Sequence, residues 1–246
     1  MLRDAWPIAW YEFKQRYLSL AMNMFASVLI ALVAVEALMR FERDDLSPNN
    51  VLTFLNVADL LLLAALPALG AFSFSREYMS WNSLTDEPFL KRLRFYRMWA
   101  IPLPVIAWSR MLYMLLCFVV SMTVFVTVFV AVGWTVLSDT RPIAHLLSFA
   151  LVWTGYAAAI CGLHPFLEYG AKAKMIHVVS IGMVVVIVGA DLLLNYLLNK
   201  PIFLHVLEMV NGNPFWPAVI SLCAGVIGII AFQRGLVRRL ERIDLP

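Results

Sequence analysis

The chain has 246 residues, of which 62% are hydrophobic and only 14% charged, a composition outside the range of water-soluble globular proteins. Its formal net charge of +3 is too small to indicate nucleic-acid binding, so nucleic acid is excluded as a partner. The cysteines lie singly in apolar runs, at Cys117, Cys161 and Cys223, which argues against disulfides and a zinc site. The composition therefore predicts an integral membrane protein.

The first predicted element is an amphipathic helix over residues 4–17. Four aromatic residues recur at helical spacing and share one narrow arc: Trp6, Trp10, Phe13 and Tyr17. Glu12 lies on the opposite face. Because Trp and Tyr favour the headgroup zone, we expect this helix to lie along the inner membrane surface. The alternative is an aromatic belt that only anchors the first span, and the pattern supports both interpretations equally.

Six stretches are long and apolar enough, or nearly so, to cross the ~30 Å hydrocarbon layer of a bilayer as helices. They run from Leu18 to Met39, Val51 to Phe74, Met111 to Leu137, Ile143 to Leu167, Met175 to Leu198 and Phe215 to Phe232. Their apolar residues are continuous, whereas the strands of a membrane barrel alternate polar and apolar residues. The sequence therefore predicts an all-α protein with six transmembrane helices in a single domain over residues 1–246.

Lys and Arg residues divide unevenly between the two sides of these spans. Fifteen of the 19 fall in the N-terminal segment, the second and fourth loops and the C-terminal tail. The other side holds Arg40, Arg43, Arg141 and Lys200. Because cytoplasmic loops of membrane proteins carry the excess of Lys and Arg, the first set is expected in the cytoplasm, and with it both termini.

The longest connection covers residues 75–109, between the second and third spans, and it falls on the predicted cytoplasmic side. It is long enough for one or two helices, and Pro88 can begin one of them. Such a helix places Phe89, Leu93 and Tyr96 on one face and carries several basic residues. We interpret it as a docking element for a cytoplasmic partner. The alternative is a basic surface helix held by lipid headgroups.

A short apolar stretch from Pro201 to Val210 precedes the sixth span. As a helix it would be about 15 Å long, which is too short to cross a bilayer. We expect it either to enter the membrane and return on the same side, as a re-entrant segment, or to lie flat on the outer surface.

Polar residues inside the predicted spans are candidates for a translocation path, because such groups usually face the interior of a helix bundle. Asp59 and Asp191 are expected at a similar depth, and Asn195 lies one turn from Asp191. They could bind a cationic substrate or protons near an outer gate, or hold the bundle together through hydrogen bonds between helices. Gly182 and Gly189 form a small-residue seam on the fifth span, which predicts close contact with another helix there.

Motifs for enzymatic chemistry are weak. The chain has no phosphate-binding loop of the G-x-x-x-x-G-K-[ST] type, no H-E-x-x-H and no G-x-S-x-G. The best candidate is His164 with Glu168 one turn later and His177 across the loop, which could bind a metal or move protons. Pro165 instead favours a kink at this point. No catalytic, cofactor-binding or metal site is therefore assigned.

Four short segments serve as landmarks: Tyr11–Lys14 before the first span, Ser75–Tyr78 after the second, and Ile101–Val105 and Ser109–Leu112 before the third. They resemble those of permeases of type-two ABC exporters. The layout of six spans with an N-terminal interfacial helix and a re-entrant segment before the last span is also similar to that family. One departure is the stretch from Glu77 to Pro102, which is longer than expected and looks like an extra helix.

The resemblance implies the membrane-spanning subunit of an ATP-driven exporter in the bacterial cytoplasmic membrane. It would form the translocation path with a second permease chain, identical or a sister, and it would not itself be an enzyme. ATP and Mg²⁺ would bind to a separate ATPase subunit. The residues expected to couple to that subunit are Arg76, Glu77, Lys91, Arg92, Arg94 and Arg97. The alternatives are a membrane-embedded enzyme acting on lipid or peptide, and an accessory membrane protein without a transport path.

Overall fold

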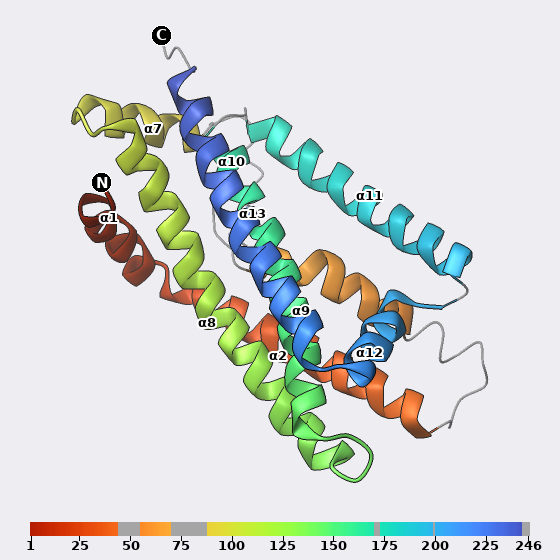
Figure 1. Ribbon diagram of the computed structural model, residues 1–246. Helices are drawn as coiled ribbons and strands as arrows, with labels where there is room; N and C mark the ends of the chain where they lie inside the picture. The colour runs from red at the N-terminus through yellow and green to blue at the C-terminus, as the bar shows by residue number, and fades with distance from the viewer. Residues whose placement is uncertain (44–54, 70–87, 170–172, 199, 243–246) are drawn as a thin grey trace.

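The computed structural model describes residues 1–43, 55–69, 88–169, 173–198 and 200–242, and every regular element within them is a helix (Figure 1). The helices include α1 Leu2–Gln15, α2 Tyr17–Arg43, the π-helical segment η1 Leu61–Ala65, α4 Leu66–Leu69, α7 Pro88–Met98, α8 Leu103–Leu137, α9 Ile143–Cys161, α10 Leu163–Glu168, α11 Ala173–Leu198, α12 Ile202–Gly212 and α13 Phe215–Glu241. The predicted all-α class is confirmed for this part of the chain.

Five helical stretches in the described residues are long and apolar enough to cross a membrane. They are Tyr17–Glu42, Leu103–Leu137, Ile143–Glu168, Lys174–Leu197 and Phe215–Glu241. The predicted second span, Val51 to Phe74, is described only over Leu55–Leu69, which is a shorter apolar helix. The chain is therefore a multi-pass helical membrane protein, and the described residues supply five of the six predicted crossings.

The third and sixth spans extend furthest beyond their predicted ends. The third was expected to begin at Met111, but α8 begins at Leu103, directly after Pro102, and has 35 residues. At 1.5 Å per residue it is about 50 Å long, well beyond the hydrocarbon thickness of a bilayer. The sixth was expected to end at Phe232, but α13 continues to Glu241. Hydropathy marks only the apolar part of a helix, whereas the backbone hydrogen bonds continue into its polar turns.

The fourth span is interrupted near its end, as Pro165 predicted. Helix α9 ends at Cys161, Gly162 separates it from α10, and Pro165 lies in α10. Proline has no N–H to donate to the carbonyl four residues earlier, which here is that of Cys161. A Cβ on Gly162 would lie 2.8 Å from Phe232 of α13, so this break is also where α13 packs closely.

Helices α9 and α13 pack with their backbones in direct contact. A Cβ built on Gly155 would lie 2.3 Å from the backbone of Ser221, and one on Gly228 would lie 2.4 Å from the carbonyl oxygen of Ala159. Both approaches are closer than any side chain permits. By contrast, a Cβ on Gly182 or Gly189 would meet nothing within 4 Å. Among the described residues, no other helix lies against the small-residue seam predicted on the fifth span, so the close contact expected there is not found in this part of the chain.

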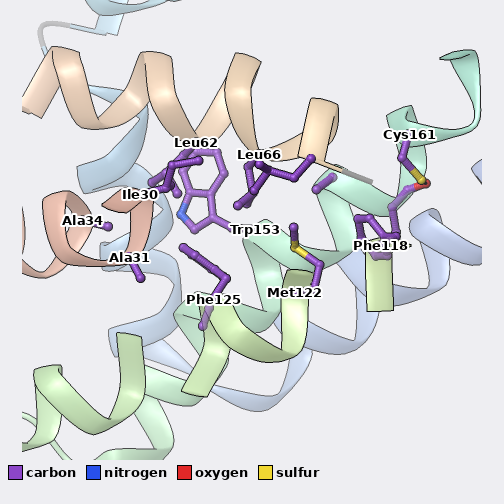
Figure 2. Packing of buried hydrophobic residues seen from close by; sticks show 14 of the residues in the cluster. Ile30, Ala31, Ala34, Leu62, Leu66, Phe118, Met122, Phe125, Trp153 and Cys161 are labelled. Atoms are coloured by element: carbon purple, nitrogen blue, oxygen red, sulfur yellow. The ribbon is translucent and has the colours of Figure 1, made fainter. Parts of the chain in front are cut away.

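The apolar core lies between α2, the segment Leu55–Leu69, α8 and α9. Figure 2 shows the ring of Trp153, from α9, between Leu62 and Phe125. Three further aromatic rings continue this core toward α12, with centroids 5.5 Å apart for Phe129 and Phe149 and 4.9 Å apart for Phe149 and Phe203. The short helix α12 is thus attached to the bundle through one apolar face.

Candidate functional site

One end of the bundle gathers α1, α7 and the last turns of α13, all of which carry basic residues, and we call it the basic end (Figure 1). At this end the Arg97 guanidinium donates to the carbonyl of Leu240 at 3.2 Å, and that of Arg239 donates to the carbonyl of Phe166 at 3.4 Å. These contacts bring together the segments that the charge count assigned to the cytoplasm. The α8–α9 connection and α12 lie at the opposite end.

The centre of the basic end is a buried ion pair between α8 and α10. Arg110, in the second turn of α8, and Glu168, the last residue of α10, are only 2% and 1% exposed. The guanidinium binds both carboxylate oxygens, with Nη2 donating to Oε1 at 2.5 Å and Nε donating to Oε2. Its carbon also lies 4.7 Å from the centre of the Tyr113 ring, which adds a cation–π contact. This bidentate geometry is the strongest form of an Arg–carboxylate pair.

Glu12 extends this ion pair to α1 and α7. One of its carboxylate oxygens pairs with Arg92 and accepts a hydrogen bond from the Tyr96 hydroxyl at 2.8 Å. The other lies 3.5 Å from Nη1 of Arg110. We call Glu12, Arg92, Arg110 and Glu168, with Tyr96, the ion cluster. Two carboxylates face two guanidinium groups, so the charges of the ion cluster cancel within a largely buried space.

Helix α1 presents its two faces as the aromatic pattern predicted, with a difference at Glu12. Trp6 and Trp10 are stacked with centroids 5.9 Å apart and are 46% and 39% exposed, so this part of the aromatic arc faces outward, whereas Phe13 is partly buried against a small cluster that includes Tyr113 of α8. Glu12 is on the opposite face, but that face packs against α8 and is buried there together with Ala5 and Ala9. Tyr17 belongs to α2, because α1 ends at Gln15.

Helix α7 divides the predicted coupling residues into two sets. Arg92 and Arg97 point inward, since Arg92 pairs with Glu12 and Arg97 with the backbone of α13. Lys91 and Arg94 are exposed. Next to them is a large apolar surface, formed by Phe95, Met98 and Trp99, which are 50%, 75% and 69% exposed. Arg76 and Glu77, the other predicted coupling residues, lie outside the described residues.

A second polar group of residues lies toward the opposite end and contains all three predicted path residues. Asp59 is completely buried, and its carboxylate accepts a hydrogen bond from the backbone N–H of Phe203, in the first turn of α12, at 2.7 Å. Asn195 donates to Asp191 at 3.4 Å and to Asn56 at 3.2 Å. Asn56 lies one turn before Asp59 in the same helical segment, so its hydrogen bond with Asn195 connects the two sets of polar residues. The structure thus brings Asp59, Asp191 and Asn195 together; their part in transport stays a prediction.

Two polar contacts that sequence reasoning missed hold the bundle together. Arg141, in the α8–α9 connection, pairs with Glu42 of α2 and donates to Asn211 of α12 at 2.6 Å. Asn23, in α2, donates to the carbonyl of Leu69 at 2.7 Å. Arg141 had been counted only as an orienting charge. The available signal was a single Arg in a short turn, together with a Glu at the end of one span and an Asn shortly before the start of another.

The candidate catalytic group of the sequence, His164, Glu168 and His177, is not supported as an assembled site. Both oxygens of Glu168 are engaged by Arg110, so this carboxylate serves an ion pair. No group of three or more His, Cys, Asp or Glu side chains is placed to hold a metal among the described residues. The side chain of His177 is not among those described.

No family model, curated protein or solved structure matches this chain. The resemblance to export permeases therefore rests on the sequence landmarks and the layout of the helices. Of the landmarks, Tyr11–Lys14 contains Glu12 of the ion cluster and Ser109–Leu112 contains Arg110. Ile101–Val105 leads into α8, and Ser75–Tyr78 lies outside the described residues. Two landmarks that are far apart in the sequence thus meet in one buried cluster.

Proposed function

We propose that this chain is the membrane-spanning subunit of an ATP-driven exporter, working as a dimer with a second permease chain and coupled to a separate ATPase. It would cross the bacterial cytoplasmic membrane six times, with Leu55–Leu69 belonging to the second crossing and both termini in the cytoplasm. The observation that carries the proposal is helix α7, which presents a basic and apolar outer surface while its inner face is tied to α1 and α8 through the ion cluster.

This arrangement suits the transmission of force. A push on the outer surface of α7 is passed through Arg92 to Glu12 and from there to Arg110 of α8. Because α8 continues as one helix from Leu103 to Leu137, a tilt at its basic end moves its far end as well. Glu168 passes the same displacement to α10 and the fourth span. Exposed ion pairs would transmit less of this displacement, because their side chains rearrange in water.

The test is purification of the tagged chain from native membranes, followed by identification of associated proteins and an ATPase assay. We expect an ATP-binding subunit with a phosphate-binding loop to co-purify. Reversal of the exposed charges, Lys91→Glu with Arg94→Glu, should reduce its recovery about tenfold at moderate salt without lowering the yield of the chain. The matched control is Arg3→Glu with Lys14→Glu on α1, which changes the net charge equally.

Three outcomes separate the alternatives. Full recovery of the ATPase with the α7 variant would show that α7 is not the docking element. Absence of any ATP-binding protein from the wild-type complex would contradict the exporter itself. A tightly bound metal together with hydrolysis of lipid or peptide by the purified chain would support a membrane-embedded enzyme instead.

A further inference from the structure

A cavity of about 140 Å³ lies between the segment Leu61–Leu69, the α9–α10 junction and α11. Nearly all of its surface is apolar, and its two polar lining residues are His164 and Ser180. Engineered cavities of about 150 Å³ with apolar walls stay free of water and bind apolar molecules such as benzene. The volume therefore suits a short length of hydrocarbon and does not suit a hydrated ion.

The cavity exists because two irregular helices face each other. One wall is the π-helical segment η1. The backbone carbonyl of Leu63 in this segment accepts a hydrogen bond from the Tyr156 hydroxyl at 2.9 Å. The other wall is the break between α9 and α10 at Gly162 and Pro165. Regular helices fill the space between them with interlocking side chains, whereas widened or broken turns leave gaps, and π-helical turns are frequent at functional sites.

The third wall is α11, which is largely exposed along its other face. Ile181 and Val185 are 65% and 64% exposed, while the neighbouring Met183 and Val184 line the cavity. Near its start, Ile176 packs against Leu167 of α10. The described part of the chain covers this apolar helix so little that its outer face suits the hydrocarbon of a bilayer. A cavity behind such a helix is open to acyl chains of the surrounding lipid.

We propose that this cavity binds a short length of an acyl chain, with the His164 imidazole and the Ser180 hydroxyl in the wall beside an ester or hydroxyl group of the same molecule. Leu167 also lines the cavity and is adjacent to Glu168 of the ion cluster, so the site lies toward the basic end of the bundle. The further step, that the exporter transports a lipid-like amphiphile, rests on the proposed function. Binding of an acyl chain in the cavity does not rest on the proposed function.

The test uses the purified full chain in phosphatidylcholine vesicles, without any ATPase, and a palmitic acid that carries a photoactivatable diazirine. After illumination, adducts are mapped by mass spectrometry. We expect them to concentrate on residues 160–167 and 180–187. Filling the cavity by Ala68→Phe or Ser180→Phe should lower these adducts about tenfold. Val185→Phe on the outer face of α11 is the matched control and should leave them unchanged.

A second variant keeps the test valid if the phenylalanine variants do not fold. Met183→Ala enlarges the cavity and should raise the adducts at residues 160–167 relative to those on exposed Ile227 of α13. A phosphatidylcholine with the diazirine on one chain identifies the source. Labelling by this probe assigns the site to bilayer lipid, and labelling by the fatty acid alone assigns it to a single-chain amphiphile. Adducts spread evenly over exposed apolar residues, and unchanged by either type of variant, would overturn the proposal.

Discussion

At the scale of single residues, the informative feature is how the buried charges are paired. Arg110 and Glu168 are almost without exposure, and an ion removed from water is tolerated only when its partners replace the lost solvation. The bidentate contact supplies that replacement, and Glu12 adds a second carboxylate to the same guanidinium. Each member of the ion cluster therefore depends on the others.

Removal of one partner of this pair should destabilise the chain strongly. We expect Arg110→Met or Glu168→Met to lower the stability of the purified chain by about 3–5 kcal/mol, because the remaining charge stays buried and loses its bidentate partner. The double variant should lose clearly less than the sum of the two. Thermal unfolding in detergent, followed by size-exclusion chromatography, measures the three variants. The exposed Arg94→Met is the control and should change little, and additive losses in the double variant would contradict the pairing.

Asp59 caps the N-terminus of a helix to which it does not belong, so the start of that helix depends on this residue. Helix α12 begins after Pro201 without a side-chain cap of its own, and Asp59 accepts the N–H of Phe203. A carboxylate is favourable at a helix N-terminus, where unpaired N–H groups point outward.

Asp59→Asn should keep the cap, because the amide oxygen still accepts this hydrogen bond, whereas Asp59→Leu should lower stability by about 1–3 kcal/mol. Export and thermal stability are to be measured together. Loss of export by a normally assembled Asp59→Asn or Asp191→Asn complex would favour a role in the translocation path. Normal export by both, with failed assembly of the leucine variants, would make these residues structural and remove the outer gate hypothesis.

At the scale of helices, glycine content alone does not identify a contact. The spacing of Gly182 and Gly189 suggested a seam, yet the close approach in the structure is between α9 and α13, at Gly155, Gly225 and Gly228. Hydroxyl groups reinforce it, since Ser221 donates to the carbonyl of Val152 at 2.6 Å. A small residue permits two helices to approach but does not say which partner will do so.

Substitution of these glycines should therefore have opposite results. Gly228→Val places side-chain atoms where the α9 backbone already lies, and we expect it to prevent recovery of monodisperse protein, with a cost above the roughly 1–3 kcal/mol of ordinary overpacking. Gly182→Val on α11 meets none of the described residues and should leave folding intact. Yield and the size-exclusion profile of the two variants decide the comparison. Equal yields would show that α9 and α13 are not in backbone contact.

At the scale of the whole molecule, the question is which end of the bundle faces the cytoplasm. The structure gathers α1, α7 and the end of α13 at one end, and Asn211 of α12 lies with Arg141 at the other. This grouping agrees with the division made by the charge count.

Reporter fusions provide the measurement. We expect reporters placed after Pro246 and at Glu87 to be cytoplasmic, and reporters at Asp45, Asp139 and Asn211 to be outside, because the excess of Lys and Arg keeps the basic end in the cytoplasm. Alkaline phosphatase and a fluorescent protein give complementary signals for the two sides. An external C-terminus would contradict the orientation, and with it the docking of an ATPase at α7.

The sequence by itself determined the membrane class, the helical content and most helix positions. These follow from local causes, namely apolar runs of membrane-spanning length, helical spacing of aromatic residues, and prolines such as Pro165 that interrupt hydrogen bonding. It also indicated that Asp59 and Asp191 would share a level, because depth in a bilayer is counted along each helix. The polar turns at the start of α8 and the end of α13 were missed, since hydropathy does not register them.

Only the tertiary structure decided which side chains meet. Glu12, Arg92, Arg110 and Glu168 come from four helices, and no periodicity in the sequence links them. Their partners depend on how the helices rotate and cross, and these angles are set by the packing of all neighbouring side chains together. The same reason explains why α9 pairs with α13, and why a cavity lies between η1, α10 and α11: each depends on the positions of several helices at once.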